Sequence, residues 1–340
     1  MAKNNQKYSI SVIVPTHNNK KTIEKCLKSI FLLKNNIKEV IVVDNCSKDG
    51  TTTIIKKFPC KLLRLNKNYG AGFARNFGAK KAKGNLLLFV DGDIELSSQA
   101  ITLILNSFKK TKNISCVVGL LSKENLCKNI ISEYKNLFMH YMVVNLPEYI
   151  STTVGAITSV KKDVFKKIGG YNPYFRAVED IDFGQRLVKN GYKIYLNKKL
   201  QVKHLKEYSL KTLLITDFKK AFYWARILLE NLDIKKLLKR KKQTDKSIDF
   251  MINCYVALFL FLTLFAFLLF QTFLLNITTS LLFAIFIFLN LKFWSFLRNT
   301  KGLKFALLSI PITLVDMATI SLGAFIGTLY YLLILKQRTH

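Results

Sequence analysis

Two carboxylates follow directly on an apolar run in the N-terminal half of the chain. The stretch Leu86–Val90 reads LLLFV, and Asp91, Gly92 and Asp93 come next. Two carboxylates held close together repel one another, and a divalent cation relieves that cost. Carboxylate oxygens suit Mg²⁺ or Mn²⁺, which usually share their site with substrate phosphates. Asp-Gly-Asp is also ordinary turn chemistry, so its place after a buried strand is what favours a metal site.

Other polar residues also stand where apolar runs end. Asp44 follows Val40–Val43, and Thr16 comes just after the first apolar run. Three acids crowd into the start of a later helical pattern: Glu179, Asp180 and Asp182. One acid is enough to cap a helix, and a like-charged neighbour raises a carboxylate's pKa, which suits a general base. His204 follows a further strand pattern, where it could ligate a metal or bind phosphate.

Short strands alternating with helices are predicted over the first 210 residues. Strand patterns fall at 9–14, 39–43, 60–65 and 86–90, and helical patterns at 21–33 and 71–83. This alternation predicts an α/β fold with a mainly parallel sheet that is covered by helices on both faces. Ligands of such sheets bind beyond the carboxyl ends of the strands. Thr16, Asp44 and Asp91–Asp93 are therefore expected along one rim.

The chain is strongly basic, with 53 Lys and Arg against 21 acids and a net charge of +32 over 340 residues. This balance indicates an anionic partner, although a lysine-rich composition explains much of it. The basic runs lack interleaved aromatic residues, so no nucleic-acid partner is expected. The 6 cysteines form no CxxC pair, which favours free thiols in a reducing compartment. The N-terminus shows no apolar core typical of a secretory signal.

Composition changes sharply near residue 250. Apolar stretches at about 251–270, 274–294 and 305–335 are long enough to cross a bilayer, so two to three membrane helices are predicted. The third contains Pro311 and a lone Asp316, and it could bend or begin as an interfacial piece. Basic residues before the first stretch, and between the second and third, place the N-terminal domain on the cytoplasmic side. The terminal Lys336 and Arg338 conflict with a simple three-span count.

A basic amphipathic segment joins the two parts. Apolar residues recur at helical spacing over 210–238, and the polybasic run Lys235–Lys246 follows. Such a helix is suited to lying on anionic lipids, or to packing against the N-terminal domain, and both interpretations stay open. The expected organisation is therefore an α/β domain over 1–209, an interfacial helix and linker over 210–249, and a transmembrane region over 250–340.

Five segments, taken in order, resemble the family-2 glycosyltransferases of the GT-A fold. They are VIVPTHNN, IVVDNCSKDGT, NKNYGAGFARNFGAKKAKGNLLLFVDGDIEL, GAITSVKKDVFKKIGGYNPYF and VEDIDFGQRLVKNGYKIYL, followed by a later His. Each segment alone is a weak signal, whereas the ordered set is a strong one. The resemblance covers about residues 8–210, and it implies a Rossmann-like catalytic domain of the GT-A type.

The resemblance implies a role for each matching residue. Asp180 would be the catalytic base, with Glu179 beside it. The donor pocket would include Thr16, Asp44, Asp91, Gly155 and Ala156, with Arg75 as a further contact to the nucleotide or its phosphates. Asp91 and Asp93 would form the DxD motif that binds Mn²⁺ or Mg²⁺, with His204 as an additional metal or diphosphate contact.

The implied activity is inverting transfer of a hexose from a nucleoside-diphosphate sugar, in the synthesis of a cell-envelope glycan or glycolipid. The expected enzyme is an integral protein of the cytoplasmic membrane that acts on a lipid-linked saccharide and contacts anionic lipids. A polyprenyl-phosphate sugar synthase is the alternative, but a catalytic base fits a hydroxyl acceptor better, because a phosphate is already deprotonated near neutral pH. The Gln-x-x-Arg-Trp motif of the processive members is missing, which disfavours polymer synthesis.

Two other classes are weaker alternatives. A membrane-bound nucleotidyltransferase should carry a Gly-rich, basic loop after its first strand, and PTHNNKKTIEK lacks one. A non-catalytic membrane adaptor would have no reason to keep several acids on one rim. The sequence leaves the sugar, the nucleotide and the oligomeric state open.

Overall fold

The structure is a computed structural model that describes residues 8–33, 37–230 and 245–337. Its contacts divide the chain into two units. The first comprises residues 1–128 and 139–207, and the second comprises residues 129–138 and 208–340. The expected boundary at residue 209 lies close to one of these divisions, but the segment 129–138 also belongs with the C-terminal helices. The polybasic run at Lys235–Lys246 lies outside the described residues except for its last two positions.

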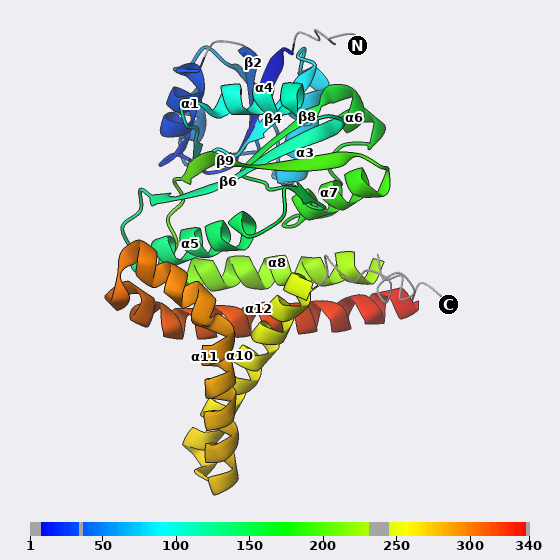
Figure 1. The fold of residues 1–340 in the computed structure, drawn as a ribbon. Coiled ribbons are helices and arrows are strands. Elements are labelled where there is room, and N and C mark those ends of the chain that lie inside the picture. The colour runs from blue at the N-terminus through cyan, green and yellow to red at the C-terminus, as the bar shows by residue number, and fades with distance from the viewer. Residues whose placement is uncertain (1–7, 34–36, 231–244, 338–340) are drawn as a thin grey trace. The chain divides into compact units, whose positions relative to one another are not determined.

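Nine strands of the first unit form one sheet in the order β3-β2-β1-β4-β8-β6-β9-β5, with β7 paired to β9. The strands are β1 (Ile10–Thr16), β2 (Ile37–Asp44), β3 (Lys61–Arg64), β4 (Leu86–Val90), β5 (Ile94–Glu95), β6 (Ile114–Asn125), β7 (Tyr149–Ile150), β8 (Ile157–Lys161) and β9 (Lys193–His204). The first four in this order are parallel neighbours, and β8 runs antiparallel to both β4 and β6. The sheet is therefore parallel across its N-terminal half, as predicted, and mixed beyond β4 (Figure 1).

Helices cover both faces of this sheet. One face packs against α1 (Ile23–Phe31), α2 (Thr51–Ile55) and α4 (Ala100–Lys110), and the other against α3 (Ala71–Lys81), α6 (Lys162–Lys167) and α7 (Glu179–Lys189). Alternate residues of β4 point to opposite faces, so Leu86, Leu88 and Val90 join the first core, and Leu87 and Phe89 join the second. This double burial explains the unbroken apolar runs of the central strands.

The first strand is longer than its sequence pattern predicts. The predicted strand ends at residue 14, but β1 continues through Pro15 to Thr16, and Pro15 pairs with Val43 of β2. Pairing of β1 with β4 stops at Ile13. The missing N–H of Pro15 therefore removes no ladder bond to β4, and the strand carries Thr16 to the rim.

The second unit contains four long helices: α8 (Leu210–Glu230), α10 (Asp245–Phe270), α11 (Phe273–Lys301) and α12 (Leu303–Gln337). Within the described residues, three stretches are long and apolar enough to cross a membrane: Asp249–Phe270, Phe273–Lys301 and Leu303–Leu333. The predicted apolar stretches therefore form helices. The basic residues expected in a loop before the third stretch instead continue α11 as far as Lys301, and Gly302 makes the break with a φ of 88°.

The residue type at Gly119 follows from the close approach of β6 and β9. A Cβ atom at this position would lie 2.4 Å from the backbone oxygen of Leu200. We expect Gly119→Ala to destabilise the first unit by about 1–3 kcal/mol, because the backbone of β9 has no room to move away. Thermal unfolding of the purified chain measures this effect. Leu32→Ala is the control, because that side chain is 84% exposed; equal unfolding midpoints in the two variants would contradict the prediction.

Candidate active site

The polar residues predicted at strand ends do lie along one rim of the sheet. Thr16 ends β1 and pairs in register with Asp44, which ends β2. Asp91 follows β4, the other neighbour of β1. Because these three strands are parallel neighbours, their carboxyl ends bring the three side chains to the same edge. The hydroxyl of Thr16 donates a hydrogen bond to the side chain of Asn19 at 2.9 Å.

Asp44 is fully buried at this rim. The backbone N–H of Ser47 donates to its Oδ1 atom at 3.0 Å. Its Oδ2 atom has no hydrogen-bond partner among the described residues, and Nε of Arg64 lies 3.6 Å away from it. A buried carboxylate oxygen without a hydrogen bond is costly unless a ligand donates one. Asp44 therefore presents a buried acceptor oxygen to the rim.

Arg75 joins two carboxylates that stand far apart in the sequence. It lies on α3, and its guanidinium donates to Oδ1 of Asp91 at 2.6 Å and to Oε1 of Glu179 at 2.6 Å. The guanidinium also lies over the ring of Tyr171, 5.2 Å from the ring centre. Burial and the nearby charge of Asp93 raise the pKa of Asp91, and the positive charge of Arg75 acts against them. The ion pair with Arg75 thus offsets part of the cost of burying the Asp91 carboxylate.

Asp93 has a different partner. Its Oδ2 atom lies 3.7 Å from Nε2 of His204, because β5 and β9 pair with Ile94 opposite His204. Burial alone would raise the pKa of Asp93, but the hydrogen bond and charge of His204, together with the charge of Lys206, lower it. The structure therefore places Asp93, the second acid of the Asp-Gly-Asp motif, next to the predicted histidine.

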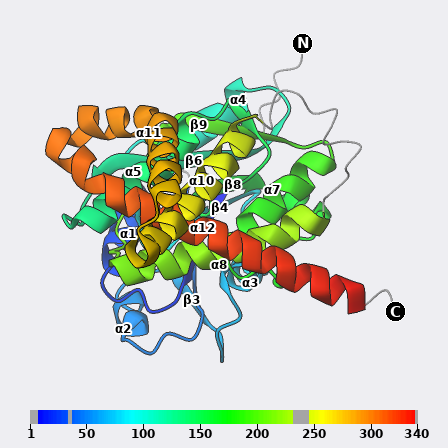
Figure 2. The same cartoon turned by 90° about the horizontal axis from the view of Figure 1, so that it is seen from below.

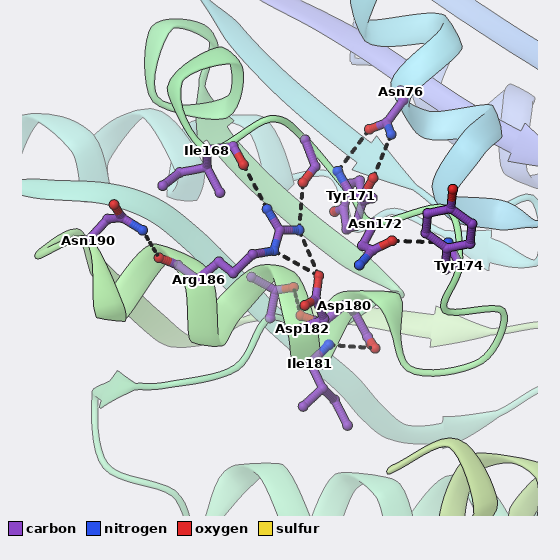
Figure 3. Close-up of polar contacts among 12 residues, drawn as sticks. Asn76, Ile168, Tyr171, Asn172, Tyr174, Asp180, Ile181, Asp182, Arg186 and Asn190 are labelled. Carbon is purple, nitrogen blue, oxygen red and sulfur yellow. Dashed lines mark hydrogen bonds and ion pairs between the residues drawn. The ribbon is translucent and has the colours of Figure 1, made fainter. Parts of the chain in front are cut away.

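Asp180 is held by backbone groups at the start of α7. The N–H of Gly155 donates to its Oδ2 atom at 3.0 Å, and the N–H of Ile181 donates to its Oδ1 atom at 2.9 Å. Asp182, two residues on, instead forms an ion pair with Arg186 at 2.7 Å (Figure 3). No side chain caps the helix at Val178. The three acids of this segment thus have three different environments, and none serves as the helix cap.

Gly155 marks the point where these groups meet. A Cβ atom built there would lie 3.2 Å from Oδ2 of Asp180 and 3.6 Å from both Oδ2 of Asp91 and Nη2 of Arg75. The next residue, Ala156, accepts a hydrogen bond from the N–H of Asp91 at 3.3 Å. A side chain at this position would therefore press against the carboxylate of Asp180, and glycine avoids that contact.

Three neighbouring residues were not singled out from the sequence. Arg64 stands beside Asp44, and Tyr171 lies under Arg75. Asn76 accepts a hydrogen bond from the N–H of Tyr171 at 2.9 Å and donates one to its carbonyl oxygen at 2.7 Å (Figure 3). In the sequence, only the position of Asn76 directly after Arg75 indicated these two hydrogen bonds to the backbone of Tyr171.

The donor set suits a hard divalent cation in one respect. No group of three or more His, Cys, Asp and Glu side chains that could hold a metal ion is found within the described part of the chain. Mg²⁺ and similar ions, however, are usually held by one or two carboxylates together with substrate phosphates. Asp91 and Asp93, with His204 beside Asp93, fit that manner of binding.

The ion pairs of Arg75 predict a large effect of its replacement on stability. Arg75→Met would leave the buried Glu179 and the partly buried Asp91 without a cation, at a cost of about 3–5 kcal/mol. Arg64→Met is the matched control, because its pair with Asp44 is longer and the Arg64 side chain is 60% exposed. Thermal unfolding of both variants measures the difference. A shift of the unfolding midpoint in Arg75→Met no larger than that in the control would contradict the prediction.

Comparison with known families identifies the first unit. Residues 11–169 match the family described as "Glycosyl transferase family 2". Residues 137–209 match the family described as "N-terminal domain of galactosyltransferase". A similar protein is an uncharacterized glycosyltransferase of Haemophilus influenzae, 30% identical over 190 residues. The poly-beta-1,6-N-acetyl-D-glucosamine synthase of Staphylococcus epidermidis is 27% identical over 194 residues.

These relatives are longer than the matched part. The alignments cover 53% of this chain and 62% of the Haemophilus protein, and 54% of this chain and 47% of the Staphylococcus protein. A solved structure of similar fold is the mannosyltransferase of Pyrobaculum calidifontis in complex with GDP-Man and Mn²⁺. It has a TM-score of 0.56 and 17% identity, and the match covers 96% of this chain and 88% of that one. Residues 11–169 therefore form a domain that matches glycosyl transferase family 2 and has a GT-A fold, and helices that are long and apolar enough to cross a membrane follow it.

Proposed function

We propose that the protein is a membrane-bound, inverting glycosyltransferase that moves a sugar from a nucleoside diphosphate to a hydroxyl of a lipid-linked saccharide at the cytoplasmic face. The observation that carries this proposal is the convergence on Gly155. There, polar atoms of Asp91, Asp180 and Arg75 all come within 3.2–3.6 Å of one point beside the backbone of Gly155. The carboxylate proposed to lie next to the diphosphate and the one proposed to lie next to the acceptor are therefore close neighbours.

The donor end of the site would be the rim at Asp44. The free Oδ2 atom of Asp44 would accept a hydrogen bond from the base or the ribose, and Arg64 lies close enough to assist. Thr16, which is in register with Asp44, would line the same pocket. From here the diphosphate would extend toward Asp91 and Asp93, because all three strand ends share one edge.

Asp91, Asp93 and His204 would hold Mn²⁺ or Mg²⁺, which would offset the negative charge that develops on the departing diphosphate. The fit rests on the hard oxygen donors of Asp91 and Asp93 and on the closeness of His204 to Asp93. Arg75 would act as a positioning residue here, because it holds Asp91 and Glu179 in fixed directions. Its direct contact with the nucleotide stays a prediction.

Asp180 would take the proton from the acceptor hydroxyl. Two backbone N–H groups fix its carboxylate, so its direction is set before the acceptor arrives. The oxygen of the acceptor would attack the anomeric carbon from the face opposite the departing diphosphate, and this inverts the anomeric configuration. Glu179, next to Asp180 in the chain, would act indirectly, because its ion pair helps to hold Arg75 in place. A lipid-linked acceptor is supported by the apolar helices of the second unit, because such an acceptor is itself held in a membrane.

The two acids of α7 give a matched test of the base. Asp180→Asn should lower the rate of transfer by about 10²–10⁴-fold, because an amide cannot take the proton. Asp182→Asn should keep transfer near the wild-type rate, because Asp182 serves the ion pair with Arg186. Rates are measured at saturating donor with folded, detergent-purified protein. Near wild-type transfer by Asp180→Asn would show that the base lies elsewhere.

A donor and acceptor screen tests the function itself. The purified chain is incubated with a panel of nucleoside-diphosphate sugars, Mn²⁺ or Mg²⁺, and a total lipid extract. We expect metal-dependent consumption of one donor, appearance of its sugar in the lipid fraction with inverted configuration, and loss of both in Asp93→Asn. Sugar attached directly to a polyprenyl phosphate would favour the synthase alternative. Folded protein that neither binds nor consumes any donor would refute the proposal.

A further inference from the structure

The second unit shows a difference among its three apolar helices. By length and composition each could cross a membrane, with mean hydropathies of 2.4, 2.1 and 1.8 in chain order. Their surroundings differ, because 39% of the third helix's apolar stretch is buried, against 22% and 17% for the first two. In Figure 1, α10 and the first part of α11 run away from α8, whereas α12 runs alongside it. Figure 2 shows α12 extending sideways from the α10–α11 hairpin.

The backbones of α8 and α12 approach very closely. A Cβ atom at Gly323 would lie 2.6 Å from the backbone oxygen of Phe218, and one at Gly327 would lie 2.5 Å from that of Phe222. Glycines four residues apart on one helix are a common means of close helix packing in membranes. The ring of Phe222 also contacts that of Tyr331, at 5.5 Å between centres. Later residues of α8 meet later residues of α12, so the pair is parallel and holds together along its length.

The charge of α8 prevents this pair from crossing a bilayer. Lys211, Lys219 and Lys220 are exposed, and the guanidinium of Arg226 lies over the ring of Tyr331 at 5.6 Å. No stretch of α8 is among the candidate spans of the described residues. Each such cation placed at the centre of a bilayer would cost about 2.5–3.5 kcal/mol. Because α12 packs along α8, it must lie at the same depth relative to the bilayer as α8.

A buried ionic cluster leads to the same conclusion independently. Lys135 of α5 (Ile130–Val144) forms an ion pair with Asp217 of α8, and the side chains of Asp217 and Asp316 of α12 are hydrogen-bonded to each other. Tyr134 donates a hydrogen bond to Oδ2 of Asp316 at 3.2 Å, and Asp316 is fully buried. The cluster thus ties α5, α8 and α12 together at one level of each helix.

The position of this cluster in the chain conflicts with a third crossing. Asp316 lies thirteen residues into α12, about 20 Å along the helix, so a crossing that began at Leu303 would carry it past the middle of a core about 30 Å thick. Lys135 would have to follow it there. However, Lys135 lies only four residues, about 6 Å of helix, before Met139, where the chain enters the first unit with its exposed lysines and acids. A crossing that began nearer Asp316 would instead carry the lysines of α8 into the bilayer, because α8 packs along α12 beyond Asp316.

We propose that α12 does not cross the membrane but lies beside α8 in the lipid interface, and that α10 and α11 form the only crossing pair among the described residues. The partner of the exposed apolar side of α12 is then the lipid interface itself. That side includes Leu307, Leu322, Phe325, Leu329 and Leu333. Within the hairpin, Asn253 and Asn290 exchange two hydrogen bonds of 2.9 Å, which hold α10 to α11.

This arrangement also removes the conflict over the basic C-terminus. Two crossings return the chain to the side of the membrane from which it started. The basic residues after α12, Lys336 and Arg338, would then be on the same side as the basic run Lys235–Lys246 before α10. Basic segments that flank spans are retained on one side of the membrane. The inference concerns topology alone, so it stands or fails separately from the proposed sugar transfer.

Two epitope tags on the full chain test the number of crossings. One tag is inserted in the turn between Gln271 and Thr272, and the other follows His340. Accessibility to antibody is measured in sealed vesicles of known orientation and again after permeabilisation. We expect the two tags on opposite faces of the membrane. Tags on the same face would mean that α12 crosses, and would overturn the inference whichever face that is.

A depth measurement tests where α12 lies. An azide-bearing residue is introduced singly at Leu307, Leu322 or Leu333 and coupled to a nitroxide, which avoids labelling the native cysteines. Leu281 of α11 serves as the deep reference. We expect the three positions of α12 to report similar, shallow depths. A depth that passes from shallow to deep and back, or probes that sense only water, would overturn the inference.

Discussion

The rim of polar residues at the strand ends depends on one buried cation, the guanidinium of Arg75. Arg75 is 2% exposed and holds Asp91, which follows β4, against Glu179, which begins α7. Without that charge, the carboxylates of Asp91 and Glu179, which come from distant parts of the chain, would stand close together with no cation between them. The ring of Tyr171 supports the guanidinium from one side, and the two hydrogen bonds of Asn76 fix that tyrosine's backbone. Because Glu179 begins α7, its ion pair with Arg75 also helps to place the next residue, Asp180, beside Gly155.

The parts of the rim that could be predicted are those whose position is local. Asp44 and Asp91 follow buried strands directly, and the end of a strand is a place that an apolar run reveals. His204 was found in the same way, although its approach to Asp93 depends on the pairing of β5 with β9. The fold class was also predictable, because strand and helix patterns alternate clearly over the first ninety residues.

The remaining features depend on contacts between residues that no periodicity connects. Arg75 and Glu179 are 104 positions apart, and only the fold shows that one guanidinium serves both acids. Asp180 and Asp182 look equivalent in sequence, but only Asp182 forms an ion pair with Arg186. Likewise, hydropathy ranks α12 with α10 and α11, because it averages over a stretch and does not record that Asp316 meets Asp217 and Tyr134. In each case one specific partner decides what the residue does.

The membership of residues 129–138 in the second unit has a practical consequence for isolating the catalytic part. A polypeptide cut off after residue 209 would keep Lys135 but lose Asp217, its buried counter-charge. It would also keep Tyr134 and Phe138, whose rings pack on Phe293, and would expose both of them to water. Such a truncated piece would expose an apolar surface that contains the ammonium group of Lys135 without its counter-charge. A soluble version of the first unit would therefore require redesign of the first turns of α5, and not only removal of the helices that follow.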